Sequence, residues 1–213
     1  MKRVILLSLI IFIASYAVIG QQFSIGIKPN FLIINAKYIE NPNVFNIHVD
    51  SRPSFGFGFT LRKSFIDQLA IQLEPTFIEK GYNLDWGGGN YDAYKNDYIS
   101  FPTLLIVTPF KNFNLELGPE LSYLVSSKIN FSYGLTRNNT SKDIHRFEAS
   151  LVFGLSYSFF KRFDLGIRYG LGIIPYAKGL VVISDTSPLP EYKVYNRYFE
   201  LSCNIRILTL GKK

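Results

Sequence analysis

The sequence contains very little cysteine and histidine and has no run of basic residues. Cys203 is the only cysteine, which excludes an internal disulfide, and with only His48 and His145 beside it no metal-ligand spacing exists. We therefore expect neither a metal nor another cofactor. The formal net charge is +7, but without a Lys/Arg cluster we expect no nucleic-acid partner. The basic excess could meet an anionic lipid surface, although we interpret it as a scattered, solvated set.

Long apolar runs are also missing once the N-terminus is set aside. Lys2 and Arg3 precede an apolar run over residues 4–13, and the small residue Gly20 follows, which is the arrangement of a secretory signal peptide. We expect residues 1–20 to be removed. The alternative, a retained N-terminal membrane anchor, would need a longer apolar run. Residues 21–213 are expected to form one domain, and they contain no stretch of about 20 apolar residues that would predict a membrane-spanning helix.

Aromatic residues and glycines are abundant, and residues 163–175 show how they are arranged. Aromatic residues make up 16% of the chain, with 14 Tyr and 19 Phe. Within 163–175 the side chains alternate with a period of two, which predicts a β-strand with one apolar face. About 11 residues are enough to cross a membrane as a tilted strand. The apolar face has Phe163, Leu165, Ile167, Tyr169, Leu171 and Ile173, and the other face has Asp164, Gly166, Arg168, Gly170 and Gly172.

The same alternation recurs along the chain and predicts eight strands. The connections between them are alternately long and short, starting with a long one. An even number of strands, short turns on one side and long loops on the other are typical of bacterial outer-membrane barrels. We therefore predict an all-β fold, an eight-stranded antiparallel up-and-down transmembrane β-barrel in the outer membrane. The expected strands are Phe23–Ile33, Pro53–Lys63, Leu69–Lys80, Asp97–Thr108, Asn114–Ser126, His145–Phe160, Phe163–Pro175 and Val194–Leu208.

Residue size indicates which face of the strands is inside. A soluble lipocalin-like barrel, the alternative, would place the apolar set around an internal cavity. Here the apolar set is dominated by Phe, Leu, Ile and Tyr, which is too much volume for a narrow lumen. The opposite set consists of Gly, Ser, Thr and Asn with a few ions, and it fits the interior of an eight-stranded barrel. We therefore expect the apolar set to face lipid.

The inward face then carries charged residues of both signs. Buried charges must be paired or hydrated, so we interpret the set as a salt-bridge network that plugs the lumen. A narrow or gated ion path and a catalytic carboxylate pair are the alternatives. The inward charges expected from the alternation are Lys28, Arg62, Glu74, Glu116, Glu120, Glu148, Arg168, Glu200 and Arg206.

Catalytic and binding motifs are weak. An outer-leaflet protease or lipid-modifying barrel would need a base, for which His48 and His145 are the only histidines, and we expect no enzyme. The segment 86–90 is glycine-rich but lacks the Lys-Ser/Thr and the helix of a phosphate-binding loop, so we interpret it as a loop tip. Aromatic residues of the expected loops could form a binding surface, although we favour an interfacial belt. These residues are Trp86, Tyr91, Tyr94, Tyr176 and Tyr192.

Several loose motifs follow one another along the chain, namely QQFSIGIKP, FGFGFTL, LEPTF, YISFPTLL, LELGPELSYL and DLGIRYGLG. Their order resembles the PorT-like outer-membrane β-barrel family of the Bacteroidetes. These motifs cover essentially the whole of residues 21–213. The resemblance implies an integral outer-membrane protein and, for the named member, a role in the secretion of other proteins. The expected partners are outer-membrane lipid and, through the outer loops, other envelope proteins.

Overall fold

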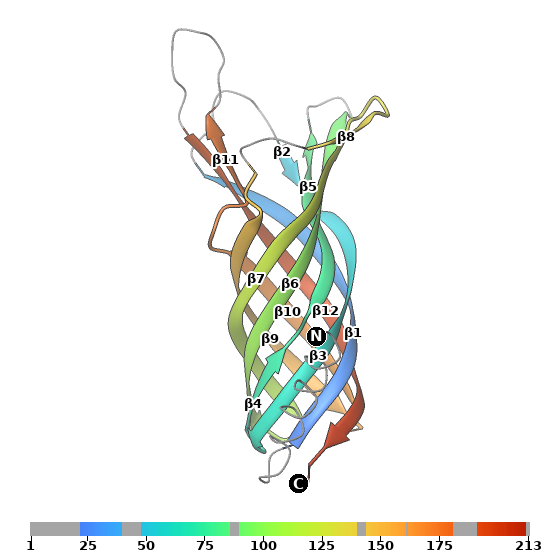
Figure 1. The fold of residues 1–213 in the computed structure, drawn as a ribbon, viewed down its shortest axis with the longest axis vertical. Helices are drawn as coiled ribbons and strands as arrows, with labels where there is room; N and C mark the ends of the chain where they lie inside the picture. Colours follow the sequence, from blue (N-terminus) through green and yellow to red (C-terminus); the bar gives the residue numbers. More distant parts are fainter. Residues whose placement is uncertain are drawn as a thin grey trace, which may run out of the picture.

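The computed structural model describes residues 22–39, 48–85, 90–139, 144–160, 162–180 and 191–211. Within this part of the chain the strands form one antiparallel sheet that closes into a tall barrel (Figure 1). The described residues include no helix that is long and apolar enough to span a membrane. The strands are β1 (Gln22–Ile39), β2 (His48–Asp50), β3 (Arg52–Ile66), β4 (Leu69–Leu73), β5 (Thr76–Asp85), β6 (Tyr91–Phe110), β7 (Phe113–Asn130), β8 (Thr136–Asn138), β9 (Phe147–Phe159), β10 (Phe163–Gly172), β11 (Ala177–Leu180) and β12 (Glu191–Leu210).

The ring has eight members, because β4 and β5 follow each other between the same two neighbours. Going round, β1 pairs with β3, β3 with β4 and β5, these two with β6, and then β7, β9, β10 and β12 follow in turn. Pairing of β12 with β1 closes the ring. At one end of the barrel, three short strands pair with longer ones: β2 with β5, β8 with β7 and β11 with β12 (Figure 1). The predicted eight-stranded antiparallel barrel is confirmed.

The two ends of the barrel differ in their connections. Short turns join β3 to β4, β6 to β7 and β9 to β10 at one end, where β1 also begins and β12 ends. We call this the turn end. The strand ends that the long connections join lie at the opposite end, which we call the loop end (Figure 1). The expected alternation of long and short connections is therefore observed.

Strand ends differ from the prediction mainly at the loop end. There β1 continues to Ile39, β6 begins at Tyr91 and β7 continues to Asn130. The expected strand Leu69–Lys80 is divided by Pro75, which has no N–H to donate to a neighbour. Inner and outer faces still alternate across this break. The expected starting point His145 precedes β9, and the signal segment 1–20 lies outside the described residues.

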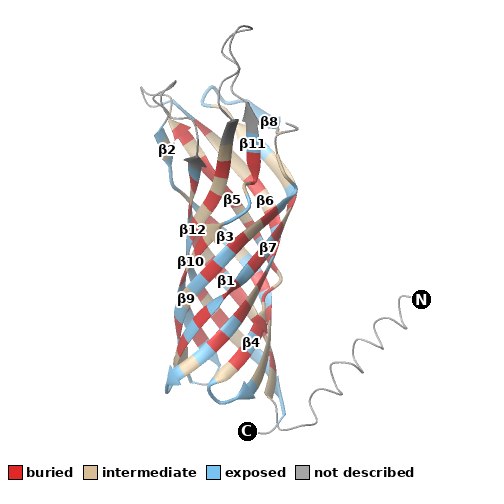
Figure 2. Ribbon diagram, turned by 90° about the vertical axis from the view of Figure 1, so that its left-hand side faces the viewer, coloured by how far each residue is buried: buried red, intermediate tan, exposed pale blue. Residues whose placement is uncertain are grey.

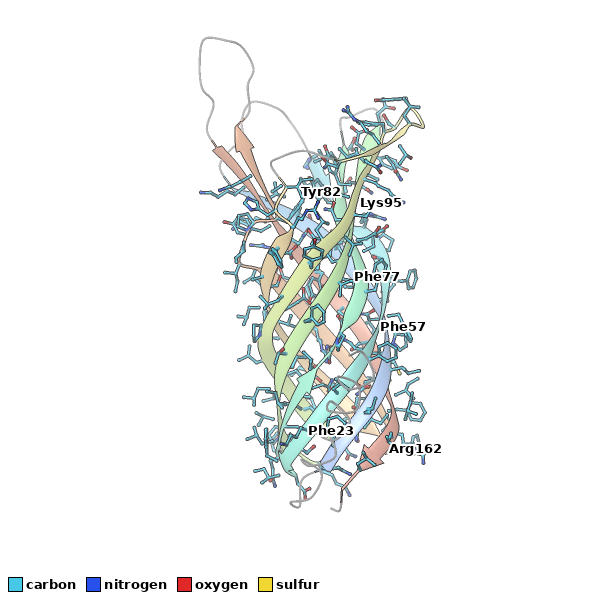
Figure 3. All side chains as sticks on the ribbon, in the orientation of Figure 1. Phe23, Phe57, Phe77, Tyr82, Lys95 and Arg162 are labelled. Atoms are coloured by element: carbon cyan, nitrogen blue, oxygen red, sulfur yellow. The ribbon has the colours of Figure 1, made fainter. Side chains whose placement is uncertain are left out.

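The apolar face of the strands points outward. Figure 2 shows buried and exposed residues alternating along the long strands of the barrel wall. Phe57 and Phe77 on the outer wall are 50% and 52% exposed, whereas Tyr82 at the loop end of the lumen is 3% exposed (Figure 3). Cys203 also lies on the outward-facing side of β12 and is a free thiol. An exposed apolar wall is what a surrounding lipid bilayer requires.

The lumen is more apolar than the alternation predicted. Leu32 and Ile34 on β1, and Leu104 and Ile106 on β6, are fully buried inside the barrel among the charged residues. The sequence signal was the weak alternation near residues 104–107, where both faces of the strand are apolar. These side chains fill the lumen between the charged groups, because a packed interior leaves few voids larger than a water molecule.

Gly118 on β7 marks a close approach between two strands. A Cβ atom at this position would lie 1.9 Å from the backbone oxygen of Thr103 on β6. We expect Gly118→Ala to lower the free energy of unfolding by about 1–3 kcal/mol, because the two strands must separate to admit the methyl group. Urea unfolding in lipid vesicles measures the effect. A Cβ atom at Gly134 would have no atom within 4 Å, but the φ of +88° at this residue makes it unsuitable as a control. Ala149→Gly on β9 is used instead, as a comparison for a small change of side-chain size in the barrel wall.

Candidate functional site

The centre of the lumen is organised around Arg168 on β10. Its guanidinium reaches Glu74 (Nη1–Oε2 2.6 Å), Glu116 on β7 (Nε–Oε2 2.5 Å) and Glu200 on β12 (Nη1–Oε1 3.4 Å). Gly170 follows on the same inner face, and a Cβ there would lie 2.2 Å from the ring of Tyr198. The small residues that flank the arginine therefore leave room for neighbouring side chains to cross the lumen.

Lys28 on β1 completes this central cluster. Its Nζ lies 2.6 Å from Oε2 of Glu74 and 2.6 Å from Oε1 of Glu200. Gln72 donates a further hydrogen bond of 2.5 Å to Glu74. Glu74 and Glu200 thus each contact two cations, and the cluster links β1, β7, β10, β12 and the β4–β5 break across the lumen.

A second cluster nearer the loop end surrounds Lys80 on β5. Its Nζ lies 2.6 Å from Oε1 of Glu120 and 3.0 Å from Oε1 of Glu148. Tyr198 donates a hydrogen bond of 2.6 Å to Glu120, and Asn196 donates one of 2.7 Å to Glu148. Lys80 also lies over the ring of Tyr198, 5.4 Å from its centroid, which adds a cation–π contact. Both carboxylates are therefore held by more than one donor.

A third cluster lies near the turn end. Arg206 on β12 forms an ion pair with Asp164 on β10, and Arg62 on β3 lies 3.9 Å from the same carboxylate. Asn204 donates a hydrogen bond of 3.1 Å to Asp164. Cations outnumber the carboxylate here, whereas carboxylates outnumber cations in the two other clusters.

The structure places all nine charged residues expected from the alternation inside the barrel and distributes them over the three clusters. Two charged members had not been included in the expected set. Lys80 stood at the end of an expected strand that in fact continues to Asp85, and Asp164 was assigned to the inner face but not counted among its charges. The alternation itself would have identified both residues. The nine are Lys28, Arg62, Glu74, Glu116, Glu120, Glu148, Arg168, Glu200 and Arg206.

Tyrosines fill the loop end of the lumen instead of forming a belt. Tyr82 and Tyr94 stack with centroids 4.9 Å apart, and Tyr176 donates a hydrogen bond of 2.9 Å to the hydroxyl of Tyr82. Tyr176 is 2% exposed, so the expected interfacial role does not apply to it. Tyr91 is exposed, whereas Trp86 and the side chain of Tyr192 lie outside the described part of the structure.

Catalytic or metal-binding geometry has little support among the described residues. They contain no group of three His, Cys, Asp or Glu side chains placed to hold a metal. His48 is on β2 opposite Asp85, while the backbone N–H of His145 bonds to the carbonyl of Tyr176. The two histidines therefore belong to different parts of the loop end. The lumen carboxylates are already paired with cations.

An outward apolar wall around a charged, filled lumen defines an outer-membrane β-barrel. The chain belongs to the outer membrane protein beta-barrel domain family, whose model matches residues 19–177. It is accordingly a protein of the bacterial outer membrane. In barrels of this membrane, short turns face the periplasm and long loops face the outside of the cell. No curated protein sequence matches the chain.

Several solved outer-membrane proteins resemble the structure at low sequence identity. Ail of Yersinia pestis, solved with the heparin analogue sucrose octasulfate, has 13% identity and a TM-score of 0.46, covering 89% of this chain and 100% of Ail. Neisserial surface protein A has 14% identity and a TM-score of 0.47, covering 89% of this chain and 99% of that one. OprG from Pseudomonas aeruginosa has 11% identity and a TM-score of 0.43, covering 91% and 97%.

Proposed function

We propose that this barrel has a plugged lumen and acts through its extracellular end, where its loops bind a partner. The observation that carries the proposal is the set of ion pairs across the lumen. Arg168 joins β10 to β7, β12 and the β4–β5 break, and Lys80 joins β5 to β7 and β9. A side chain held from several strands cannot leave the lumen without breaking several charged hydrogen bonds at once.

Strand length supports a role outside the membrane. About 9–11 tilted residues cross a bilayer, but β6 and β12 each have 20 residues. The outer face of β6 is apolar at Ile99 and Phe101 and becomes polar at Asp97 and Lys95 towards the loop end. Roughly half of these long strands therefore stands above the bilayer and supports the outer loops.

A closed lumen makes a direct electrical prediction. The full chain, inserted into a planar bilayer, is expected to show no stepwise conductance above the baseline, because the charged clusters and the tyrosines occupy the lumen. Single-channel recording measures this, with protein-free detergent as the control. Regular conductance steps from the wild-type protein would overturn the plug and favour the ion-path alternative.

The loop-mediated role predicts a contact at the tip of the β7–β8 hairpin. Tyr133 there is 68% exposed, and Ser132 is anchored by a hydrogen bond from its N–H to Asp92 on β6. A photoreactive residue at position 133 is expected to cross-link to a discrete envelope component in intact cells. The same residue at Leu117, which is 53% exposed on the lipid-facing wall, is the control. Equal products from both positions would contradict loop-mediated binding.

Two finer assignments remain part of the proposal. The order of the strand motifs favours a PorT-like protein, for which an accessory role in envelope protein secretion or gliding is the second candidate function. We also propose that the protein is not an enzyme. Support comes from the pairing of Glu120 and Glu148 with Lys80 and from the placement of the two histidines on separate segments.

A further inference from the structure

Four cationic side chains lie together on the outer surface near the loop end. Lys37 on β1, Lys178 on β11, and Lys193 and Arg197 on β12 form what we call the basic patch. Lys178 is paired directly with Lys193, and Lys37 is paired with Tyr195, which lies between Lys193 and Arg197 on β12. Diagonal neighbours in an antiparallel pair are about 7–8 Å apart, so Lys37 is close to both flanking cations.

The four named side chains of the patch all carry positive charge. Like charges directly opposite each other on paired strands are destabilising, as for Lys178 and Lys193. No ion pair found among the described residues includes Lys37, Lys178 or Arg197. The Nε of Arg197 is also buried without a hydrogen-bond partner in the described structure. An anion from outside the chain would give Lys37, Lys178 and the guanidinium of Arg197 a partner.

The position of the patch indicates the source of that anion. Ile33, Phe199 and Tyr169 lie side by side on the outer wall, with the rings of Phe199 and Tyr169 4.7 Å apart. The next outward residue of β12 towards the loop end is Arg197. The patch therefore starts directly above the apolar wall, at the depth where lipid headgroups meet the protein. Tyr195 lies within the patch, and tyrosine is enriched at the membrane–water interface.

The outer rim of the barrel at the loop ends of β5, β6 and β7 carries charges of both signs instead of an excess of positive charge. There Glu79 is paired with Asp97, and the next outward residues of β6 and β7 are the paired Lys95 and Lys128. Lys95 is seen at the loop end in Figure 3. Acidic and basic pairs are thus neighbours on this side of the wall and can balance each other.

We propose that the basic patch binds the phosphate groups of a phosphorylated lipid of the surrounding outer leaflet. The apolar wall below would contact the acyl chains, and Lys37, Lys178 and Arg197 would contact the headgroup. Each Lys or Arg close to an anionic membrane surface contributes about 1 kcal/mol, which is roughly fivefold in affinity. The assignment does not depend on the plug or on loop-mediated binding.

Matched double substitutions test the proposal in the full-length, detergent-solubilised barrel. Fluorescent diphosphoryl lipid A is titrated, and its anisotropy gives the affinity. We expect K37Q/K178Q to weaken binding roughly ten- to thirtyfold. K95Q/K128Q, which removes two lysines from the mixed-charge rim, is expected to weaken it less than about twofold. The charge-retaining K37R/K178R variant should bind as wild type, and heat-modifiable gel migration verifies that each variant is folded.

Three results would overturn the proposal. One is unchanged affinity in K37Q/K178Q, and another is an equal loss in K95Q/K128Q, which would indicate general charge attraction. In the third, soluble inorganic polyphosphate displaces the lipid at an equal concentration of phosphate groups. That result would assign the patch to a soluble polyanion, with the membrane lipid only an incidental ligand.

Discussion

Replacing Arg168 with methionine is expected to lower the free energy of unfolding by about 4 kcal/mol, because removal of one partner leaves buried charges uncompensated. Methionine keeps most of the side-chain volume but removes every contact to Glu74, Glu116 and Glu200. Lys28 would then be the only cation left in the central cluster. Urea titration in lipid vesicles, read by the difference in gel mobility between folded and unfolded barrel, measures the loss.

A second substitution distinguishes lost charge balance from lost packing. Glu116→Gln in the Arg168→Met background removes one unpaired carboxylate, so it should recover part of the stability. Arg146→Met is the matched control, because Arg146 is exposed and its guanidinium donates a hydrogen bond to the hydroxyl of Tyr123. If Arg168→Met unfolds at the wild-type urea concentration and also opens a large conductance, Arg168 is a gate and has no structural role in the plug.

Replacing Lys80 with methionine is expected to cost about 3 kcal/mol of folding stability, again because buried charge loses its partner. Glu120 and Glu148 both lie within 3.0 Å of the Lys80 Nζ and would share the site without a cation. Tyr198 and Asn196 would still donate hydrogen bonds to them, so the loss should be smaller than at Arg168. Urea unfolding in vesicles and thermal loss of the compact gel species provide independent measurements.

The carboxylates themselves provide the test of this explanation. In the triple variant K80M/E120Q/E148Q no charge remains in the cluster, and stability should return to within about 1 kcal/mol of wild type. Lys95→Met, which removes a lysine from the outer rim, should change stability by less than about 0.5 kcal/mol. A triple variant as unstable as Lys80→Met would show that packing around the lysine, and not charge pairing, holds this part of the lumen.

Much of the fold could be predicted because lipid imposes a strict alternation on each strand. Phe55, Phe57 and Phe59 indicate an outward face, so the residues between them must face the lumen. The alternation carries no information above the bilayer, where the outer face meets water. Backbone pairing continues above the bilayer without this alternation. The sequence therefore did not predict that β1 continues to Ile39 and β7 to Asn130.

The charged residues of the lumen could be predicted, but their partners could not. Alternation places Arg168 and Glu74 on the inner face, yet they come from distant strands and meet only across the lumen. Which charged residues lie at the same height along the barrel axis depends on the stagger of the strands around the ring. This stagger cannot be predicted from the sequence of any single strand. Similarly, the pairing of Lys178 with Lys193 depends on the register of β11 and β12. Four cations that are scattered in the sequence therefore lie together in the structure.

The pairing of β1 with β12 has a consequence for the order of assembly. This pairing runs from Phe23 opposite Leu210 to Ile39 opposite Lys193. The first strand of the barrel therefore cannot pair on this edge until the last strand has been synthesised. Until then β1 and β10 each have an edge with unpaired backbone groups, which the hydrocarbon core of a membrane does not tolerate. The whole wall must therefore be produced and kept from aggregating before it can enter lipid, and insertion becomes a concerted, late event. A chain cut before β12 should accumulate in the periplasm as a substrate for proteases.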